Sequence, residues 1–199
     1  MEAYLAGLEL NTLQLLRTYT ASHAVFNGLA AMQHALLRHE REQGLYILNL
    51  FSGYLRKLSS LCQAPNAAWL DEQASMVVYA DLENLRYRPE CSIEMEEIKS
   101  SFLVPSFICI PMLERQLFRA LRAEAAMVLK ITTDTRDGYV QVQVQADKAM
   151  PAFAALSLNS EQRQRMMLLD ERLQLFGNQV SYTESSKGLI LKLTKHTTL

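Results

Sequence analysis

The fold of this chain is decided by residues 127–145, which have the sequence MVLKITTDTRDGYVQVQVQ. The dipeptide Asp137-Gly138 separates two runs that have the composition of strands, and this dipeptide is a strong signal for a tight hairpin turn. In the second run valines alternate with glutamines, so one face of the strand is apolar and the other is polar. The sequence therefore predicts a hairpin of two antiparallel strands, at 127–133 and 138–145.

Helices and further strands are predicted on both sides of this hairpin. Helical periodicity and end signals such as Pro89 and Gly177-Asn178 predict helices at 69–87, 111–124 and 160–176. Short apolar runs predict strands at 91–98, 179–184 and 188–194. This mixture favours a layer of helices on one mostly antiparallel sheet.

The first sixty residues have a different pattern, which predicts two long helices. Residues 3–43 contain no proline, and mostly apolar residues recur there at alternating steps of four and three, at Leu8, Thr12, Leu15, Tyr19, Ser22, Phe26, Leu29, Gln33 and Leu36. A second apolar rhythm covers 45–62, and Gly44 between them suits a helix end. A hairpin of two helices buries little surface alone, so we expect it to pair with a second copy as a four-helix bundle.

Pro65 and Asn66 mark the first domain boundary. We therefore expect a helical hairpin at 1–64 and an α/β sandwich at 65–199. The fold class is α+β, with the N-terminal helical hairpin, as a dimeric four-helix bundle, preceding the sandwich.

Composition excludes several other classes of protein. The 199 residues carry a net charge of −1, which gives nucleic-acid binding no support. Cys62, Cys91 and Cys109 neither pair in sequence nor cluster with histidine, so we expect no metal site. An odd number of cysteines without a secretory signal fits a reducing cytoplasm. No apolar stretch approaches the roughly eighteen residues of a membrane span, so we expect a cytoplasmic protein without one.

Four groups of residues follow the order and spacing of motifs in one known family. They are Ser22-His23-Ala24-Val25-Phe26-Asn27; Phe51-Ser52-Gly53-Tyr54-Leu55-Arg56-Lys57; Glu72, Tyr79, Leu82-Glu83 and Arg86-Tyr87; and Pro105 followed by Pro111-Met112-Leu113-Glu114. Together they resemble the LytS-like sensor histidine kinases, in which a histidine-bearing helical region precedes a GHKL-type ATPase domain. The resemblance covers residues 19 to 194. It implies that 1–64 is a dimerisation and histidine-phosphotransfer hairpin and that 65–199 is a degenerate histidine-kinase-ATPase-like α/β sandwich.

His23 aligns with the family's phosphoacceptor histidine, within the family pattern Asn-Pro-His-Phe-Leu-Phe-Asn. The resemblance implies that His23 accepts a phosphoryl group, and it carries over Asn27 as a second catalytic-site residue. The Asn-Pro pair before the histidine and the Phe after it are missing here. Ser22 belongs to the mostly apolar series from Leu8 to Leu36, which we call the apolar seam. His23 therefore lies beside this seam, where an exposed imidazole can act as a nucleophile. The alternative is an ordinary surface histidine.

The resemblance also implies that the nucleotide site is degenerate, at Glu114, Arg115 and Asp147. Arg115 occupies the place of the family's Mg²⁺-holding asparagine, and a guanidinium has no lone pair for a metal. Asp147 matches the family's adenine-recognising aspartate. The glycines that should follow it are absent from 147–151, as are those of the later lid segment at 164–169. We therefore expect no bound cofactor.

These features predict a cytoplasmic, homodimeric protein of two-component signalling. It would act as a histidine phosphotransferase, carrying phosphoryl groups on His23 to and from a response regulator without an ATP site of its own. An alternative is a catalytically silent pseudokinase, a dimeric scaffold that binds a regulator or a partner histidine kinase. A third hypothesis, which the degenerate site disfavours, is an active histidine kinase.

Overall fold

The computed structural model describes residues 2–20, 29–30, 32–33, 36–87, 91–96, 102–123 and 126–195. The helices of this part are α1 (Glu2–Thr20), α3 (Arg41–Leu61), α4 (Trp69–Tyr87), α5 (Cys109–Ala120) and α6 (Ser160–Phe176), with two short 3-10 turns, η1 (Phe153–Ala155) and η2 (Gly177–Gln179). The strands are β1 (Asn66–Ala68), β2 (Cys91–Met95), β3 (Leu103–Pro105), β4 (Met127–Arg136), β5 (Tyr139–Ala146), β6 (Val180–Ser185) and β7 (Gly188–Thr194).

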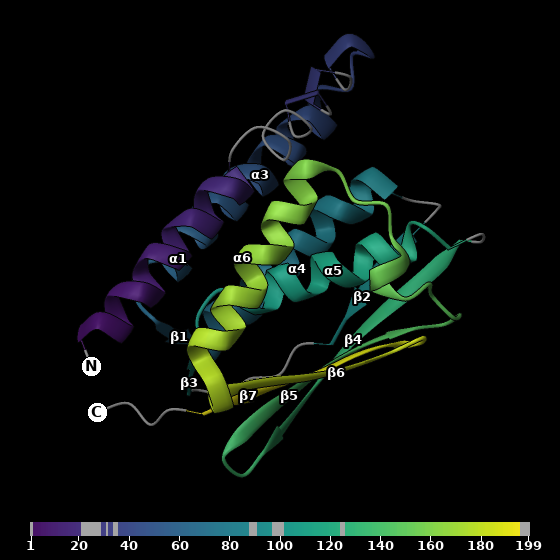
Figure 1. The fold of residues 1–199 in the computed structure, drawn as a ribbon. Coiled ribbons are helices and arrows are strands. Elements are labelled where there is room, and N and C mark those ends of the chain that lie inside the picture. Colours follow the sequence, from purple (N-terminus) through teal and green to yellow (C-terminus); the bar gives the residue numbers. More distant parts are fainter. Residues whose placement is uncertain are drawn as a thin grey trace.

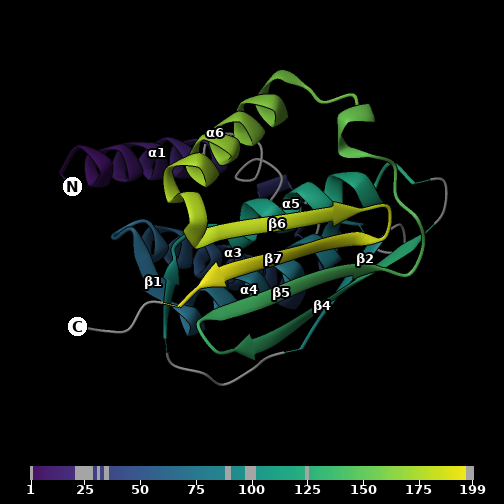
Figure 2. The same cartoon turned by 60° about the horizontal axis from the view of Figure 1, so that its bottom comes forward.

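The described elements form layers over one sheet. Five strands are ordered β2-β4-β5-β7-β6, and all neighbours are antiparallel except β2 and β4. Helices α4, α5 and α6 cover one face of this sheet, and α1 and α3 lie outside them (Figures 1 and 2). Helix α1 packs along α6, and α3 packs along α4. The observed class is α+β, as predicted.

The predicted hairpin is confirmed, and so are two helices at their predicted bounds. Strands β4 and β5 pair across Asp137-Gly138, where Gly138 has a φ of 81° that suits glycine. The valines of β5 are buried beneath the helices, while its glutamines face the other way. Helices α4 and α6 match the predictions for 69–87 and 160–176.

Other predictions were wrong in detail. The expected helix over 3–43 does not reach its predicted end, because the chain turns at 38–40 with His39 at a φ of 61°. Gly44 ends no helix; it lies buried inside α3. Helix α5 starts two residues before the predicted Pro111 and ends at Ala120 instead of 124. The pairing of β1 with β3 was not predicted, because three-residue strands leave no periodic pattern.

The first part of the predicted apolar seam is buried within this chain. Leu8 and Leu15 on α1 are at most 1% exposed, with Thr12 buried between them. Arg172 of α6 reaches across to this seam, donating hydrogen bonds to the Leu8 carbonyl (3.4 Å) and to the Thr12 hydroxyl. Burial lowers the pKa of Arg172 to about 10, although the negative charge of Glu72 acts to raise this pKa. These contacts fix α1 to the α/β layer, and the division of the chain at residues 64 and 65 stays a prediction.

Within the described ranges, no helix combines the length and the apolar character that crossing a membrane requires.

Candidate functional site

The predicted site residues fall into two groups. His23 and Asn27 lie outside the described residues. The structure places Glu114 and Arg115 next to each other on α5, and Asp147 directly after β5. The part of the candidate site that can be described therefore consists of α5 and the residues that contact it.

The start of α5 is held by a carboxylate from another helix. Glu72 of α4 accepts hydrogen bonds from the backbone N–H groups of Phe107 and, at 3.4 Å, Cys109. Glu72 thus accepts hydrogen bonds from N–H groups at the start of α5, as an N-cap side chain usually does at a helix N-terminus. Glu72 is fully buried, and burial raises its pKa to about 7 despite the opposing hydrogen bonds and the charge of Arg172.

Glu114 is engaged by a buried arginine of α6. Arg165 Nη1 lies 2.6 Å from Glu114 Oε1, and both side chains are buried. The other terminal nitrogen of Arg165 pairs with Glu161, one helical turn earlier on α6. Glu114 is thus held in a buried ionic network that joins α5 to α6.

Arg115 is engaged by Glu184 of β6 and by two aromatic rings. Its Nε lies 3.2 Å from Glu184 Oε1 and its Nη2 lies 3.4 Å from Oε2, a two-point contact that suits the planar guanidinium. The guanidinium carbon lies 3.7 Å from the centre of the Phe153 ring and 5.8 Å from that of Tyr182. Arg115 therefore joins α5 to β6 and to the turn η1.

Two more α5 side chains complete the cluster around Glu184. Gln116 Nε2 donates to Glu184 Oε1 at 2.7 Å, and Arg119 Nη1 lies 3.3 Å from the same oxygen. Burial would raise the pKa of Glu184, but the hydrogen bonds and positive charges around it outweigh burial and hold this pKa below its usual value.

Arg119 also binds backbone on both sides of the cluster. It is 1% exposed, and it donates to the carbonyls of Pro151 at 2.8 Å and Ser185 at 2.6 Å. Burial lowers the pKa of Arg119, while Glu184 opposes that shift. We call Arg115, Gln116, Arg119 and Glu184 the α5 cluster. Its contacts attach the segment after β5 and the β6–β7 turn to α5.

Asp147 has a local role in the sheet. Its carboxylate accepts a hydrogen bond from the Val128 N–H at 2.9 Å, and its own N–H donates to the Val128 carbonyl at 3.1 Å. These bonds extend the pairing of β4 and β5 by one step. The structure does not bring Asp147 into hydrogen-bond contact with the described residues of the α5 cluster.

The arrangement offers no metal ligand set. In the part of the chain that the structure describes, no three His, Cys, Asp or Glu side chains are grouped so that they could hold a metal ion. At the α5 position where the sequence resemblance expects a metal-binding amide, Arg115 is already paired with a carboxylate. The cluster can bind protein segments to each other. Its two guanidinium groups have no lone pairs for a metal, and its one carboxylate, that of Glu184, is engaged by Arg115, Gln116 and Arg119.

Sequence reasoning missed Glu184 and Arg165. A signal for Glu184 existed, because strand alternation places it on the same face of β6 as the buried Val180. A carboxylate on the inward face of a strand needs a cation or several donors. The spacing of Glu161 and Arg165, four apart on a helix, was also readable, but it does not reveal Glu114 as a further partner.

Comparisons with known proteins found solved structures that are similar to this chain. No family model and no curated protein matches it in sequence. It is similar to the histidine kinase AdeS of Acinetobacter baumannii, with 12% identity, a TM-score of 0.44 and coverage of 86% of this chain and 97% of that one. It is also similar to a structure described as a bacterial phosphotransferase, with 13% identity, a TM-score of 0.49 and coverage of 92% and 95%.

A third similar structure is the histidine kinase domain of a blue-light-activated kinase from Erythrobacter litoralis. The identity is 14% and the TM-score is 0.45, with coverage of 96% of this chain and 93% of that one. These are similarities of low identity, and they carry no information on individual site residues.

Proposed function

We propose that this chain is a cytoplasmic, dimeric protein of two-component signalling that carries phosphoryl groups on His23 and has no ATP site of its own. The absence of an ATP site in this proposal rests on the position and contacts of Arg115. This arginine stands where the sequence resemblance expects the metal-binding asparagine, and it is joined there to Glu184 and stacked on Phe153.

The residues around α5 do not fit a Mg²⁺–nucleotide. A cationic guanidinium has no lone pair with which to ligate a metal, so Arg115 could not hold Mg²⁺ as an asparagine would. Arg119 is committed to Pro151, Ser185 and Glu184. The segment 147–151 lacks the glycines that would let its backbone approach a phosphate. The backbone N–H of Met150 is already bonded to the Ser186 carbonyl at 2.6 Å.

The proposed transfer needs only an imidazole and a phosphorylated partner. A lone pair of the His23 ring nitrogen attacks the phosphorus of the regulator's aspartyl phosphate and forms an N–P bond. The P–O bond to the aspartate breaks, and the carboxylate leaves with the electron pair. The ring N–H proton can leave to water, so the phosphohistidine is neutral at the ring. The reverse reaction passes the group to the aspartate of a second regulator.

We propose that the helices of residues 1–64 form the dimer contact. Five leucines of α1 and α3 remain 38% to 60% exposed in the single chain: Leu5, Leu10, Leu13, Leu45 and Leu48. We propose that these leucines contribute to an interaction surface, because contiguous exposed apolar area on a protein marks interaction sites. A second copy of the same helices would cover it in a symmetric bundle.

The alternative proposal is a silent pseudokinase that binds a regulator or a partner histidine kinase without chemistry. It is favoured by the loss of the Asn-Pro pair before His23, which the sequence resemblance expects at an active phosphoacceptor. Both proposals share the degenerate nucleotide site and the dimer. They differ in whether His23 becomes phosphorylated.

Phosphoryl uptake separates the two. The chain is mixed with a phosphorylated response regulator from the same organism, and the intact mass of the chain is measured at neutral pH. A gain of one phosphoryl group by the wild type, and not by His23→Gln, supports the phosphotransferase. Complex formation with no mass change supports the scaffold.

A further inference from the structure

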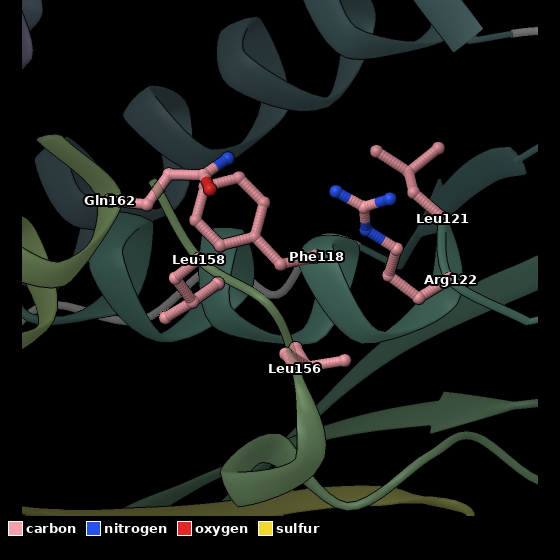
Figure 3. A pocket seen from close by; sticks show the side chains of 6 residues that line it. All are labelled: Phe118, Leu121, Arg122, Leu156, Leu158 and Gln162. Atoms are coloured by element: carbon pink, nitrogen blue, oxygen red, sulfur yellow. The ribbon is translucent and has the colours of Figure 1, made fainter. Parts of the chain in front are cut away.

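A hollow of about 310 Å³ lies beyond the α5 cluster, where three segments meet. It is lined by Phe118, Leu121 and Arg122 at the end of α5, by Leu156 and Leu158 after η1, and by Gln162 in the first turn of α6 (Figure 3). Its volume is at the lower end of the range for small-molecule sites, which is about 300 to 1,000 Å³. The hollow therefore has room for one small molecule.

The wall of the hollow is apolar. Phe118, Leu121, Leu156 and Leu158 are all half-buried, so each presents part of its side chain to the space between them. In Figure 3 the Phe118 ring lies between the ends of the Gln162 and Arg122 side chains. An exposed aromatic face with leucines around it suits a flat apolar body.

The polar groups at the hollow are hydrogen-bond donors. The Gln162 carbonyl oxygen accepts the Asn159 N–H at 3.1 Å in the α6 capping box, which leaves its amide N–H groups as donors. Arg122 is exposed, and no carboxylate among the described residues lies within ion-pair distance of it. The neighbouring arginines 115, 119 and 165 all have acidic partners.

From this combination we infer that the hollow binds a small aromatic carboxylate. The ring would lie on Phe118 between the leucines, and the carboxylate would accept hydrogen bonds from the Arg122 guanidinium. A nucleoside triphosphate does not fit this chemistry, because one exposed arginine cannot balance its charge. The inference goes beyond the phosphotransfer proposal and does not depend on it.

Calorimetry with naphthoate as the probe tests this inference on the full chain. The wild type should bind naphthoate in a saturable way, and the uncharged analogue naphthamide at least about tenfold more weakly, since a hydrogen bond to a charged group contributes about 1.5 to 3 kcal/mol. Arg122→Gln should weaken naphthoate binding by a similar factor and leave naphthamide binding unchanged.

Two variants control for unspecific effects. Arg163→Gln removes an exposed arginine of α6 that does not line the hollow, and it should bind naphthoate like the wild type. Leu156→Asn places an amide in the wall and should weaken both probes. The inference is overturned if the wild type shows no saturable naphthoate binding, if Arg122→Gln binds naphthoate as well as the wild type, or if the acid and the amide bind equally.

Discussion

Replacing Glu184 by Gln should destabilise the protein more than any exposed carboxylate substitution does. Gln keeps the size and one carbonyl oxygen of the side chain, but it removes the negative charge that Arg115 and Arg119 share. Removing the anion costs more free energy at Arg119 than at Arg115, because the Arg119 side chain is only 1% exposed. The loss of charge therefore acts on a buried cation.

The expected loss in free energy of unfolding is about 2 to 3 kcal/mol. Breaking a fully buried ion pair costs about 3 to 5 kcal/mol, and a hydrogen bond to a charged group contributes about 1.5 to 3. The lower range applies because the Glu184 side chain is 19% exposed, so water can reach the altered site. The Arg119 bonds to Pro151 and Ser185 also remain.

The effect should depend on pH in a defined direction. The pKa of Glu184 is lowered in the folded state from its ordinary value of 4.5. Its stabilising contribution is therefore fully present above pH 4.5 and is lost as the pH falls through the lowered folded-state pKa. The difference between wild type and Glu184→Gln should be constant near neutral pH and should shrink in acid.

Urea unfolding of wild type, Glu184→Gln and the exposed control Glu9→Gln measures this. A loss below about 0.5 kcal/mol for Glu184→Gln, which is the size of an ordinary surface substitution, would refute the account of the cluster. So would a difference from wild type that grows as the pH is lowered.

Three further predictions concern other parts of the fold. Gly188→Ala should cost more than about 3 kcal/mol in urea unfolding, because its φ is 146° and an added Cβ would lie 2.0 Å from the Val144 carbonyl oxygen; a loss below about 1 kcal/mol would contradict this. Because the Glu72 pKa is raised to about 7, its stabilising contribution is full below pH 4.5 and is lost as the pH rises through 7. The stability of the wild type should therefore decline over this window, and Glu72→Gln should flatten that decline. An unchanged pH profile of stability in Glu72→Gln would argue against this role. Glu substitutions at Phe26 and Leu29 should turn the proposed dimer into a monomer, since buried unpaired charge is costly, and light scattering that finds the wild type monomeric would end the dimer proposal.

Helix ends with local signals could be predicted from the sequence. Helix α6 begins after Asn159, whose side chain caps it together with Gln162, and it ends at Gly177, which has a φ of 53°. Both are local effects of single residues. The α5 start could not be predicted in the same way. The N–H groups of Phe107 and Cys109 bind Glu72, which lies 35 and 37 residues earlier in the chain, so the helix begins before the proline that marked it in the sequence.

The sequence supports an expectation about Arg115 alone, but it does not reveal which residues contact that side chain. Arg115 alone is enough to argue against a bound metal, because that argument concerns one side chain. Its partner Glu184 is 69 residues away, and only the order of the strands brings β6 to α5. The apolar seam on α1 has the same limitation. Its period predicts burial for Leu8 and Leu15, but it does not reveal that α6 of the same chain would cover them.

The central claim is that this protein takes its phosphoryl group from a partner and not from ATP. The most direct test measures the intact mass of the wild-type chain at neutral pH after two parallel incubations, one with Mg²⁺ and ATP and one with the phosphorylated response regulator. We predict a gain of one phosphoryl group in the second incubation alone, and its loss in His23→Gln. A gain with ATP, or equal labelling of wild type and His23→Gln by the regulator, would contradict the claim.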